Sequence, residues 1–198
     1  MKGAGGERRE APAPAESPAE AAAEAVVAEA TPVAEVSPTD EAQVGALLRV
    51  AGEEGLSVCV AGGATKLEWG DPPRRFDLLL RTGALQSATQ LDADDLCVSA
   101  SAGITVASLA ATAGAAGRVL PLDVACLERG TLGGTVATAV QGPRSPAYGR
   151  VKDLVLGLRA VLPDGTSARF GGRTMKNVAG YDMTRLLTGS YGALGVIT

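Results

Sequence analysis

The alternation of apolar and polar positions predicts short helices and strands from residue 37 to the end of the chain. Between residues 44 and 51 the apolar positions recur at helical spacing, after a start signal at 37–41 in which a hydroxyl cap precedes acidic side chains. Gly55 is placed to end this helix. The apolar runs at 56–61 and 76–80 then predict two buried strands.

The middle of the chain predicts a hairpin followed by a helix. Residues 85–91 and 96–100 have the composition of strands, and an acidic turn at 92–95 joins them. The spacing of this turn fits no calcium-binding loop, which favours a solvated turn over a metal site. From 105 to 115 the apolar residues return to helical spacing, and Gly117 follows.

The last part of the chain predicts a second hairpin, a short helix and a final strand. A long apolar run at 151–162 leads into a Pro-Asp-Gly turn, and residues 168–171 return as the partner strand. Asp182 is suited to cap a helix over 182–188. Residues 189–198 then predict a turn and a strand.

The first 36 residues differ from the rest in composition. They consist largely of Ala, Pro, Glu and Gly, with almost no large apolar side chains. Such a segment cannot bury enough apolar surface to offset the entropy lost on ordering. We therefore predict a disordered N-terminal tail at 1–36 and a folded domain at 37–198.

Charge separates nearly the same two regions. The net charge of the whole chain is −4 at pH 7, and the first 38 residues account for it, since they carry seven glutamates against three basic side chains. The remainder is balanced and lacks the basic excess that is typical of nucleic-acid binding. We therefore expect no nucleic-acid partner.

Cysteine and histidine usage excludes several chemistries. The three cysteines are widely spaced without a CxxC pair or a secretion signal, which predicts free thiols in a reducing cytoplasm. The chain has no histidine, so histidine triads, histidine metal sites and histidine-linked flavins are excluded. We expect no metal site and no membrane span, because no apolar run reaches the roughly 20 residues that a span needs.

Three glycine-rich segments stand out against this background. In the first, at 61–66, a predicted strand ends in two glycines followed by Ala-Thr-Lys; the others lie at 130–142 and 171–198. Backbone N–H groups in such a turn can bind an anion, with the hydroxyl and the ammonium as further donors. The spacing of nucleotide-hydrolase loops is absent. Because glycine at this density indicates close backbone approach, we interpret the three segments as one site for a large, flat, anionic ligand.

Taken in order, these segments resemble the FAD-binding domain of the vanillyl-alcohol oxidase/PCMH flavoprotein family, and within it the FAD-binding subunits of bacterial glycolate oxidases. The resemblance rests on AGGATKLEWG at 61–70, LPLD at 120–123, GTLGGTVAT at 130–138 and the whole stretch 151–198. It implies an α+β fold of the PCMH type, in which two subdomains, here about 37–95 and 96–198, hold FAD noncovalently between them.

The resemblance also implies which residues contact the cofactor. The first segment resembles the family's pyrophosphate-binding loop, and the second resembles the loop and helix start that approach the flavin and its ribityl-phosphate arm. The third contains the family's KNVAGYD element and its closing segment beside the cofactor. No catalytic residue is nominated in this chain. The implied cofactor-binding residues are Gly62, Gly63, Ala64, Thr65, Lys66, Gly133, Gly134, Thr135, Thr138, Lys176, Asn177, Gly180, Tyr181, Gly192, Gly195, Val196 and Ile197.

Two positions depart from the family pattern. Ala64 stands where a third glycine is frequent, and its Cβ would crowd the phosphate if the residue requires a positive φ. Ala139 stands where the family commonly has an asparagine, which removes one polar donor near the flavin. Family members also continue into a substrate-binding cap domain, which we expect to be absent from this chain.

The function implied by the resemblance is that of the FAD-binding subunit or fragment of a flavin-dependent 2-hydroxy-acid oxidoreductase, a glycolate oxidase or dehydrogenase. The resemblance also implies partner subunits, including an iron–sulfur subunit. Because this chain has no CxxC cluster, any iron–sulfur relay would lie in such a partner. The protein would be cytoplasmic, with any membrane association through those partners. The alternative is a non-catalytic flavin-fold module that binds partner subunits, which the missing cap and the two alanines favour. Activity of the chain by itself stays open.

Overall fold

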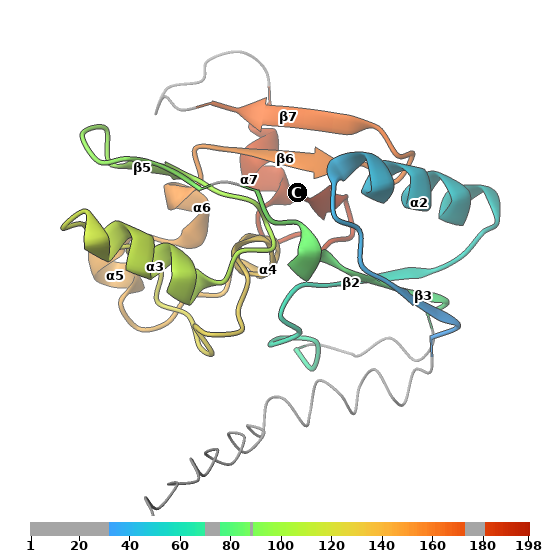
Figure 1. Cartoon of the computed structure of the whole chain (residues 1–198), viewed down its shortest axis with the longest axis horizontal. Helices are drawn as coiled ribbons and strands as arrows, with labels where there is room; N and C mark the ends of the chain where they lie inside the picture. Colours follow the sequence, from blue (N-terminus) through green and yellow to red (C-terminus); the bar gives the residue numbers. More distant parts are fainter. Residues whose placement is uncertain (1–31, 70–75, 88, 173–180) are drawn as a thin grey trace, which may run out of the picture.

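The computed structural model describes residues 32–69, 76–87, 89–172 and 181–198. Over these residues the chain forms short helices and short strands, and the strands make three small sheets (Figure 1). The predicted α+β class is confirmed.

The first sheet is parallel and comes from the N-terminal part of the described chain. Its strands are β1 (Ala34–Val36), β2 (Val58–Ala61) and β3 (Leu78–Arg81), in the order β1-β3-β2. Both pairings, β1 with β3 and β2 with β3, run over the full length of the shorter strand. The strands predicted at 56–61 and 76–80 are thus confirmed, with shorter bounds.

Strand β1 shows that the predicted boundary at residue 37 is wrong by a few residues. Its residues pair with Leu78 to Leu80 of β3, and Glu35 forms an ion pair with Arg81, with 2.5 Å between Oε1 and Nε. The folded region therefore includes the end of the predicted tail. The composition of residues 1–36 does not predict this strand, because the strand forms by pairing with a distant segment. Glu35 and Arg81, for example, are 46 positions apart in the sequence.

Helix α2 (Glu41–Glu53) connects β1 to β2. It starts where predicted, but the capping group is the carboxylate of Asp40, which accepts a hydrogen bond from Gln43 N at 2.8 Å, in place of the expected hydroxyl. Gly55 follows the helix at φ +65°, the left-handed conformation that favours glycine after a helix.

The second sheet is the predicted hairpin of β4 (Gln90–Asp92) and β5 (Cys97–Ser99). Its first strand is shorter than 85–91, because a 3₁₀ turn, η1 (Thr82–Ala84), follows β3 and Leu85 is buried in the core. Helix α3 (Val106–Ala115) comes next and agrees with the prediction.

Helix α4 (Leu132–Thr138) begins in the second glycine segment. It ends at Ala139, whose φ is +53°, in the left-handed region. Two single-turn helices follow, α5 (Ser145–Tyr148) and α6 (Val151–Leu154). The apolar run that begins at 151 therefore starts with a helical turn before it becomes a strand.

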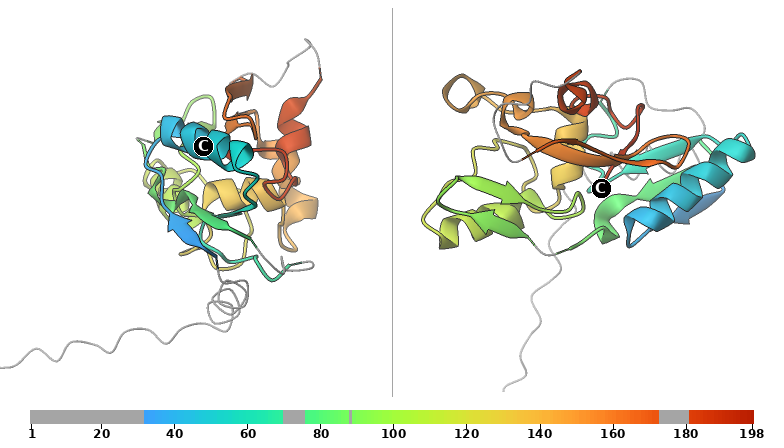
Figure 2. Two further views of the ribbon diagram at one scale, coloured as in Figure 1. Left: turned by 90° about the vertical axis from the view of Figure 1, so that its right-hand side faces the viewer. Right: turned by 90° about the horizontal axis from the view of Figure 1, so that it is seen from above.

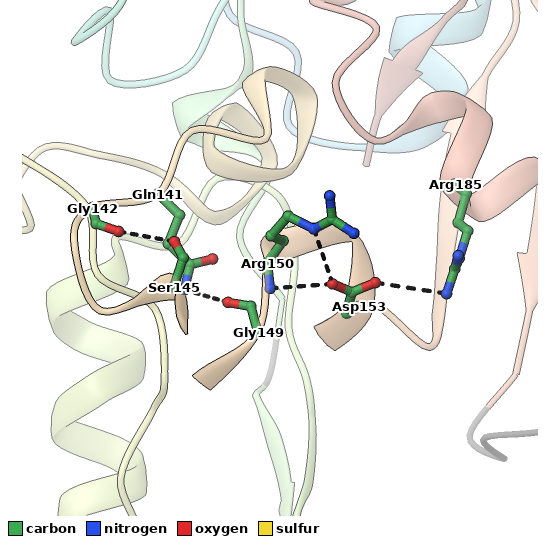
Figure 3. Close-up of polar contacts among 7 residues, drawn as sticks. All are labelled: Gln141, Gly142, Ser145, Gly149, Arg150, Asp153 and Arg185. Atoms are coloured by element: carbon green, nitrogen blue, oxygen red, sulfur yellow. Dashed lines mark hydrogen bonds and ion pairs between the residues drawn. The ribbon is translucent and has the colours of Figure 1, made fainter. Parts of the chain in front are cut away.

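Polar side chains fix this stretch (Figure 3). Asp153 Oδ2 accepts hydrogen bonds from Arg150 N and Arg150 Nε, both at 3.3 Å, at the start of α6. Its other oxygen lies 3.7 Å from Nη2 of Arg185, which comes from a later helix. Gln141 Nε2 donates to the carbonyl oxygen of Gly149 at 3.0 Å. These contacts explain why residues 151–154 form a turn of helix although their composition is that of a strand.

The third sheet is antiparallel, in the order β7-β6-β8. Its strands are β6 (Gly157–Val161), β7 (Ser167–Gly171) and β8 (Val196–Ile197). Helix α7 (Met183–Leu187) precedes β8, and the Asp182 carboxylate caps it by accepting from Arg185 N at 3.1 Å. The predicted hairpin, helix, cap and final strand are confirmed.

One apolar core joins the first and third sheets through α2. Helix α2 lies beside the strands of the third sheet (Figure 2). The buried residues of the core are Val44, Leu48, Leu80, Leu85, Val161 and Val196. Residues of both predicted subdomains thus share this core, while the division into subdomains stays a prediction. The shared core holds the end of β2 close to β8, which places the first and third glycine segments next to each other.

Candidate functional site

A cavity of about 110 Å³ lies where the end of β2, the start of α4 and residues 191–197 meet. All three glycine-rich segments contribute to its wall, although they are far apart in the sequence. The predicted cofactor-binding residues that line it are Gly62, Gly63, Ala64, Thr65, Lys66, Gly133, Gly134, Thr138, Gly192, Gly195, Val196 and Ile197.

Two further predicted residues that the structure describes, Thr135 and Tyr181, are not in this wall. Thr135 belongs to α4 but is fully buried, and its neighbours Gly134 and Thr138 line the cavity instead. Tyr181 is 95% exposed and lies away from the cavity lining. Lys176, Asn177 and Gly180 lie outside the described residues.

The glycines of the first turn allow two segments to approach closely. A β-carbon at Gly62 would overlap Thr131 Oγ1, and a β-carbon at Gly63 would overlap the carbonyl oxygen of Arg129. Both neighbours belong to the segment that leads into α4. Glycine at 62 and 63 is therefore required by contact between the first and second glycine segments, independently of any ligand.

The first turn also presents unused hydrogen-bond donors. Within the described ranges, the backbone N–H groups of residues 63–66 donate to no acceptor of the chain. Lys66 Nζ donates to Thr65 Oγ1 at 3.3 Å. A row of successive backbone donors with a lysine beside it has the chemistry of an anion-binding nest.

The start of α4 has the opposite property. The N–H groups of its first turn donate to Ile104 O, Ala102 O, Thr131 Oγ1 and Thr131 O, at 2.8 to 3.2 Å. Gly133 fits tightly there, because a β-carbon would come within 2.6 Å of Ala102 Cβ. At Gly133 and Gly134, helix α4 therefore presents backbone without side chains to the cavity, and its first turn has no free N–H donor.

Ala64 adopts the conformation that the sequence analysis identified as unfavourable for its side chain. Its φ is +54°, in the left-handed region where a β-carbon is strained and glycine is not. Because Ala64 lies among the free donors of residues 63–66, its methyl group is placed on the turn that would receive an anion.

Burial dominates the electrostatics of Lys66. Desolvation lowers the pKa of its ammonium below the ordinary value of 10.5, while the smaller effects of Cys126 and Glu68 act in the opposite direction. The partly buried ammonium has therefore lost part of its hydration. An anion in the cavity would offset this loss and raise the pKa again.

Residues 189–197 are held against the last turn of α4. Gly189 N donates to Val136 O at 3.0 Å, and Tyr191 N donates to Ala137 O at 2.8 Å. Gly192 has φ +81°, so the chain turns sharply before it enters β8. These bonds fix the third glycine segment as a wall of the cavity.

Further residues line the cavity that the sequence analysis did not single out: Val60, Ala61, Leu67, Thr82, Thr131, Ala137 and Tyr191. Thr131 carried a signal, since a threonine three positions before Gly134 fits a helix cap, and its hydroxyl does accept from Gly134 N at 3.2 Å. Nothing local signals Tyr191, because its position depends on the contact with α4.

The fold and this cavity define a cofactor-binding domain of mixed α and β structure. Residues 32–171 match the family described as FAD binding domain, and the chain belongs to this family. The predicted family, its PCMH-type fold and FAD as the cofactor are thus confirmed.

Known relatives agree with this assignment. The chain is 37% identical to the D-lactate dehydrogenase of Archaeoglobus fulgidus over 161 residues, which cover 81% of this chain and 36% of that protein. It is 45% identical to the glycolate oxidase subunit GlcE of Escherichia coli over 108 residues, or 54% of this chain and 31% of that protein. The structure of alkyldihydroxyacetonephosphate synthase superposes with a TM-score of 0.68 at 25% identity, covering 83% of this chain and 32% of that one.

The chain spans about a third of the length of these relatives. It is an FAD-binding domain of the kind found in flavin-dependent oxidoreductases of the glycolate oxidase and lactate dehydrogenase type. In the parts that the structure describes, no helix has the length and apolar character needed to cross a membrane.

Proposed function

We propose that FAD binds noncovalently in this cavity, with its diphosphate on the first glycine turn. The observation that carries the proposal is the set of free N–H groups at residues 63–66 beside the partly buried ammonium of Lys66. A diphosphate needs several donors with little side chain in the way. The residues present fit this requirement, apart from the methyl group of Ala64.

Helix α4 has a different role in this proposal. Since its first-turn N–H groups all have acceptors, Gly133 and Gly134 contribute close approach rather than hydrogen bonds. Thr138 donates its hydroxyl proton to Gly134 O at 2.8 Å, so its oxygen can still accept from a hydroxyl of the ribityl arm.

The size of the cavity limits how much of FAD it encloses. Pockets for drug-sized ligands, which are smaller than FAD, usually have volumes of roughly 300–1,000 Å³, and this cavity has about 110 Å³. Other parts of the protein would therefore cover the rest of the cofactor. We assign part of that task to Lys176, Asn177, Gly180 and Tyr181, as the family resemblance implies.

We propose further that the whole protein oxidises a 2-hydroxy acid, with glycolate as the first candidate because of the similarity to GlcE. FAD supplies the hydride acceptor in such chemistry. The residues of this chain bind and orient the cofactor, and we assign no catalytic residue among them. We place the substrate contacts in a cap domain and the further electron transfer in partner subunits, including an iron–sulfur subunit.

The alternative is an assembly module that keeps the flavin fold without catalysis. The positive φ of Ala64 favours it, because a strained methyl group at the diphosphate position would weaken cofactor binding. Addition of glycolate to the FAD-loaded assembly under anaerobic conditions separates the two functions. Bleaching of the flavin absorption supports the oxidoreductase, and unchanged absorption in the complete assembly supports the module.

The proposed cofactor site is tested by replacing Lys66. In a titration followed by flavin fluorescence, Lys66→Met should weaken FAD binding at least about tenfold, since a charge-assisted hydrogen bond contributes roughly 1.5–3 kcal/mol. ADP binding, measured by calorimetry, should weaken similarly, and riboflavin binding should not. Lys152→Met, on α6 away from the cavity, is the matched control. Equal FAD affinity in both variants would contradict the proposed position of the diphosphate.

A further inference from the structure

Tyr191 is the aromatic side chain of the cavity. Among the described residues that line it, Tyr191 alone has an aromatic ring, and 55% of the residue is exposed. The rest of the described wall combines glycine and aliphatic residues, such as Val60, Ala137 and Ile197, with polar ones: Thr65, Lys66, Thr82, Thr131 and Thr138. An exposed aromatic ring on such a wall is available for contact with a flat ligand.

The backbone of Tyr191 is held in an unfavourable conformation. Its φ is +55°, a region that a bulky side chain rarely adopts. The hydrogen bond from Tyr191 N to Ala137 O, at 2.8 Å, and that from Gly189 N to Val136 O, at 3.0 Å, tie this turn to α4. Glycine or asparagine would adopt the same φ with less strain. A tyrosine held in such a strained conformation beside a cavity indicates a function for its ring.

We propose that the ring of Tyr191 contacts one of the two flat aromatic ring systems of FAD, and that Tyr191 is thereby a cofactor-contacting residue that selects for a ligand with such a ring. The inference rests on the proposed function, because it concerns the same cavity. The ring system is either the isoalloxazine or the adenine. Both offer an aromatic face on which a tyrosine ring can stack or pack edge to face.

The test uses variants that separate the ring from the backbone. Tyr191→Asn removes the ring but tolerates the positive φ, whereas Tyr191→Phe keeps the ring and removes only the hydroxyl. Tyr148→Asn serves as the matched control, because Tyr148 is 49% exposed on α5 and does not line the cavity. The dissociation constants of FAD, FMN and ADP are measured for each protein, together with the melting temperature of the ligand-free chain.

We expect Tyr191→Asn to weaken FAD binding about tenfold, with Tyr191→Phe and Tyr148→Asn within about twofold of the unchanged protein. The melting temperature of Tyr191→Asn should not fall. If FMN binding weakens and ADP binding does not, the ring contacts the isoalloxazine; the reverse pattern assigns the contact to the adenine.

Three results would overturn the inference. The first is FAD affinity within twofold of the unchanged protein in Tyr191→Asn, and the second is an equal loss in Tyr191→Phe. The third is a loss that accompanies a fall in melting temperature, since that would show a damaged turn. If the unchanged protein binds none of FAD, FMN and ADP, the proposed function itself fails, which distinguishes that failure from failure of the Tyr191 contact.

Discussion

The hydroxyl oxygen of Thr131 occupies the space into which a β-carbon of Gly62 would project. The same oxygen accepts the hydrogen bond from Gly134 N, at 3.2 Å, that caps α4. One buried side chain thus sets both the start of this helix and its distance from the first glycine turn. The shape of the cavity depends on this contact, because residues of both segments line it.

Gly62→Ala should therefore destabilise the chain by about 2 kcal/mol, the usual cost of overpacking a well-packed position. Urea unfolding measures the change. Gly83→Ala is the matched control, since a β-carbon at Gly83 meets no atom within 4 Å. In a Thr131→Ala background, Gly62→Ala should lower the free energy of unfolding by less, because the oxygen that the new β-carbon would overlap is absent. Equal costs of Gly62→Ala in both backgrounds would show that the contact is not the cause.

Ala64→Gly should stabilise the chain and strengthen FAD binding. Glycine removes left-handed strain of about 1–2 kcal/mol but loses more backbone entropy on folding, so the net gain should be roughly 0.5 kcal/mol. Leu96→Gly provides the control, since Leu96 also has a positive φ, +54°, but lies in the β4–β5 turn. Both variants should raise the melting temperature, and only Ala64→Gly should lower the dissociation constant of FAD. Unchanged FAD affinity in Ala64→Gly would remove Ala64 from the diphosphate contact.

The lowered pKa of Lys66 predicts weaker phosphate binding at alkaline pH. A bound diphosphate favours the ammonium, so the pKa of Lys66 is higher in the complex than in the free protein, where burial lowers it below 10.5. Affinity is then greatest below the free-protein pKa and falls as pH rises through it. ADP is the suitable probe, because the isoalloxazine of FAD releases a proton of its own in alkaline solution. Calorimetric titrations should show this loss in the unchanged protein and in Lys152→Met but not in Lys66→Met.

The Lys66 contribution to the stability of the ligand-free chain should increase as pH rises, whereas the affinity for ADP decreases. Because the pKa of Lys66 is lower in the folded than in the unfolded state, the unfolded state binds more protons in this window. The Lys66 contribution to the free energy of unfolding therefore rises with pH as the folded chain loses its proton first. A plot of the difference in melting temperature between the unchanged protein and Lys66→Met against pH tests this sign. A difference that falls with increasing pH would contradict it.

The lowered pKa of Asp153 predicts a loss of stability at acid pH. Hydrogen bonds from the Arg150 backbone, and then the charges of Arg150 and Arg185, lower the pKa of this carboxyl below 3.8. Its contribution to stability is present above 3.8 and is lost as pH falls through the lowered value. Asp153→Asn should therefore lower the melting temperature at neutral pH, with the difference vanishing in strong acid. A difference that persists unchanged in acid would show that the carboxylate charge does not matter.

Elements with local signals were predictable from the sequence. The spacing of Val44 and Leu48 identified α2, and Asp182 marked the start of α7. The hairpin of β6 and β7 followed from its Pro-Asp-Gly turn. Such signals are contained in neighbouring residues, so they do not depend on the rest of the fold.

Elements that depend on distant contacts were missed. Strand β1 lies in a segment with the composition of a tail and exists through its pairing with β3. Helix α6 lies in an apolar run; Arg150 caps it locally through Asp153, and Arg185 of the later helix α7 lies 3.7 Å from the same carboxylate. The convergence of three glycine segments was inferred from their composition and the family resemblance. Tyr191 carries no local signal, since its segment is held against α4 by the hydrogen bonds of Gly189 and Tyr191 to Val136 and Ala137.

The most direct test of the account is the visible absorption spectrum of the purified chain after incubation with FAD and removal of unbound cofactor. We expect a flavin spectrum in the protein fraction and release of the colour into the supernatant on acid precipitation. Colour that stays in the precipitate would contradict noncovalent binding. A chain that remains colourless would contradict the proposal that these residues form an FAD site.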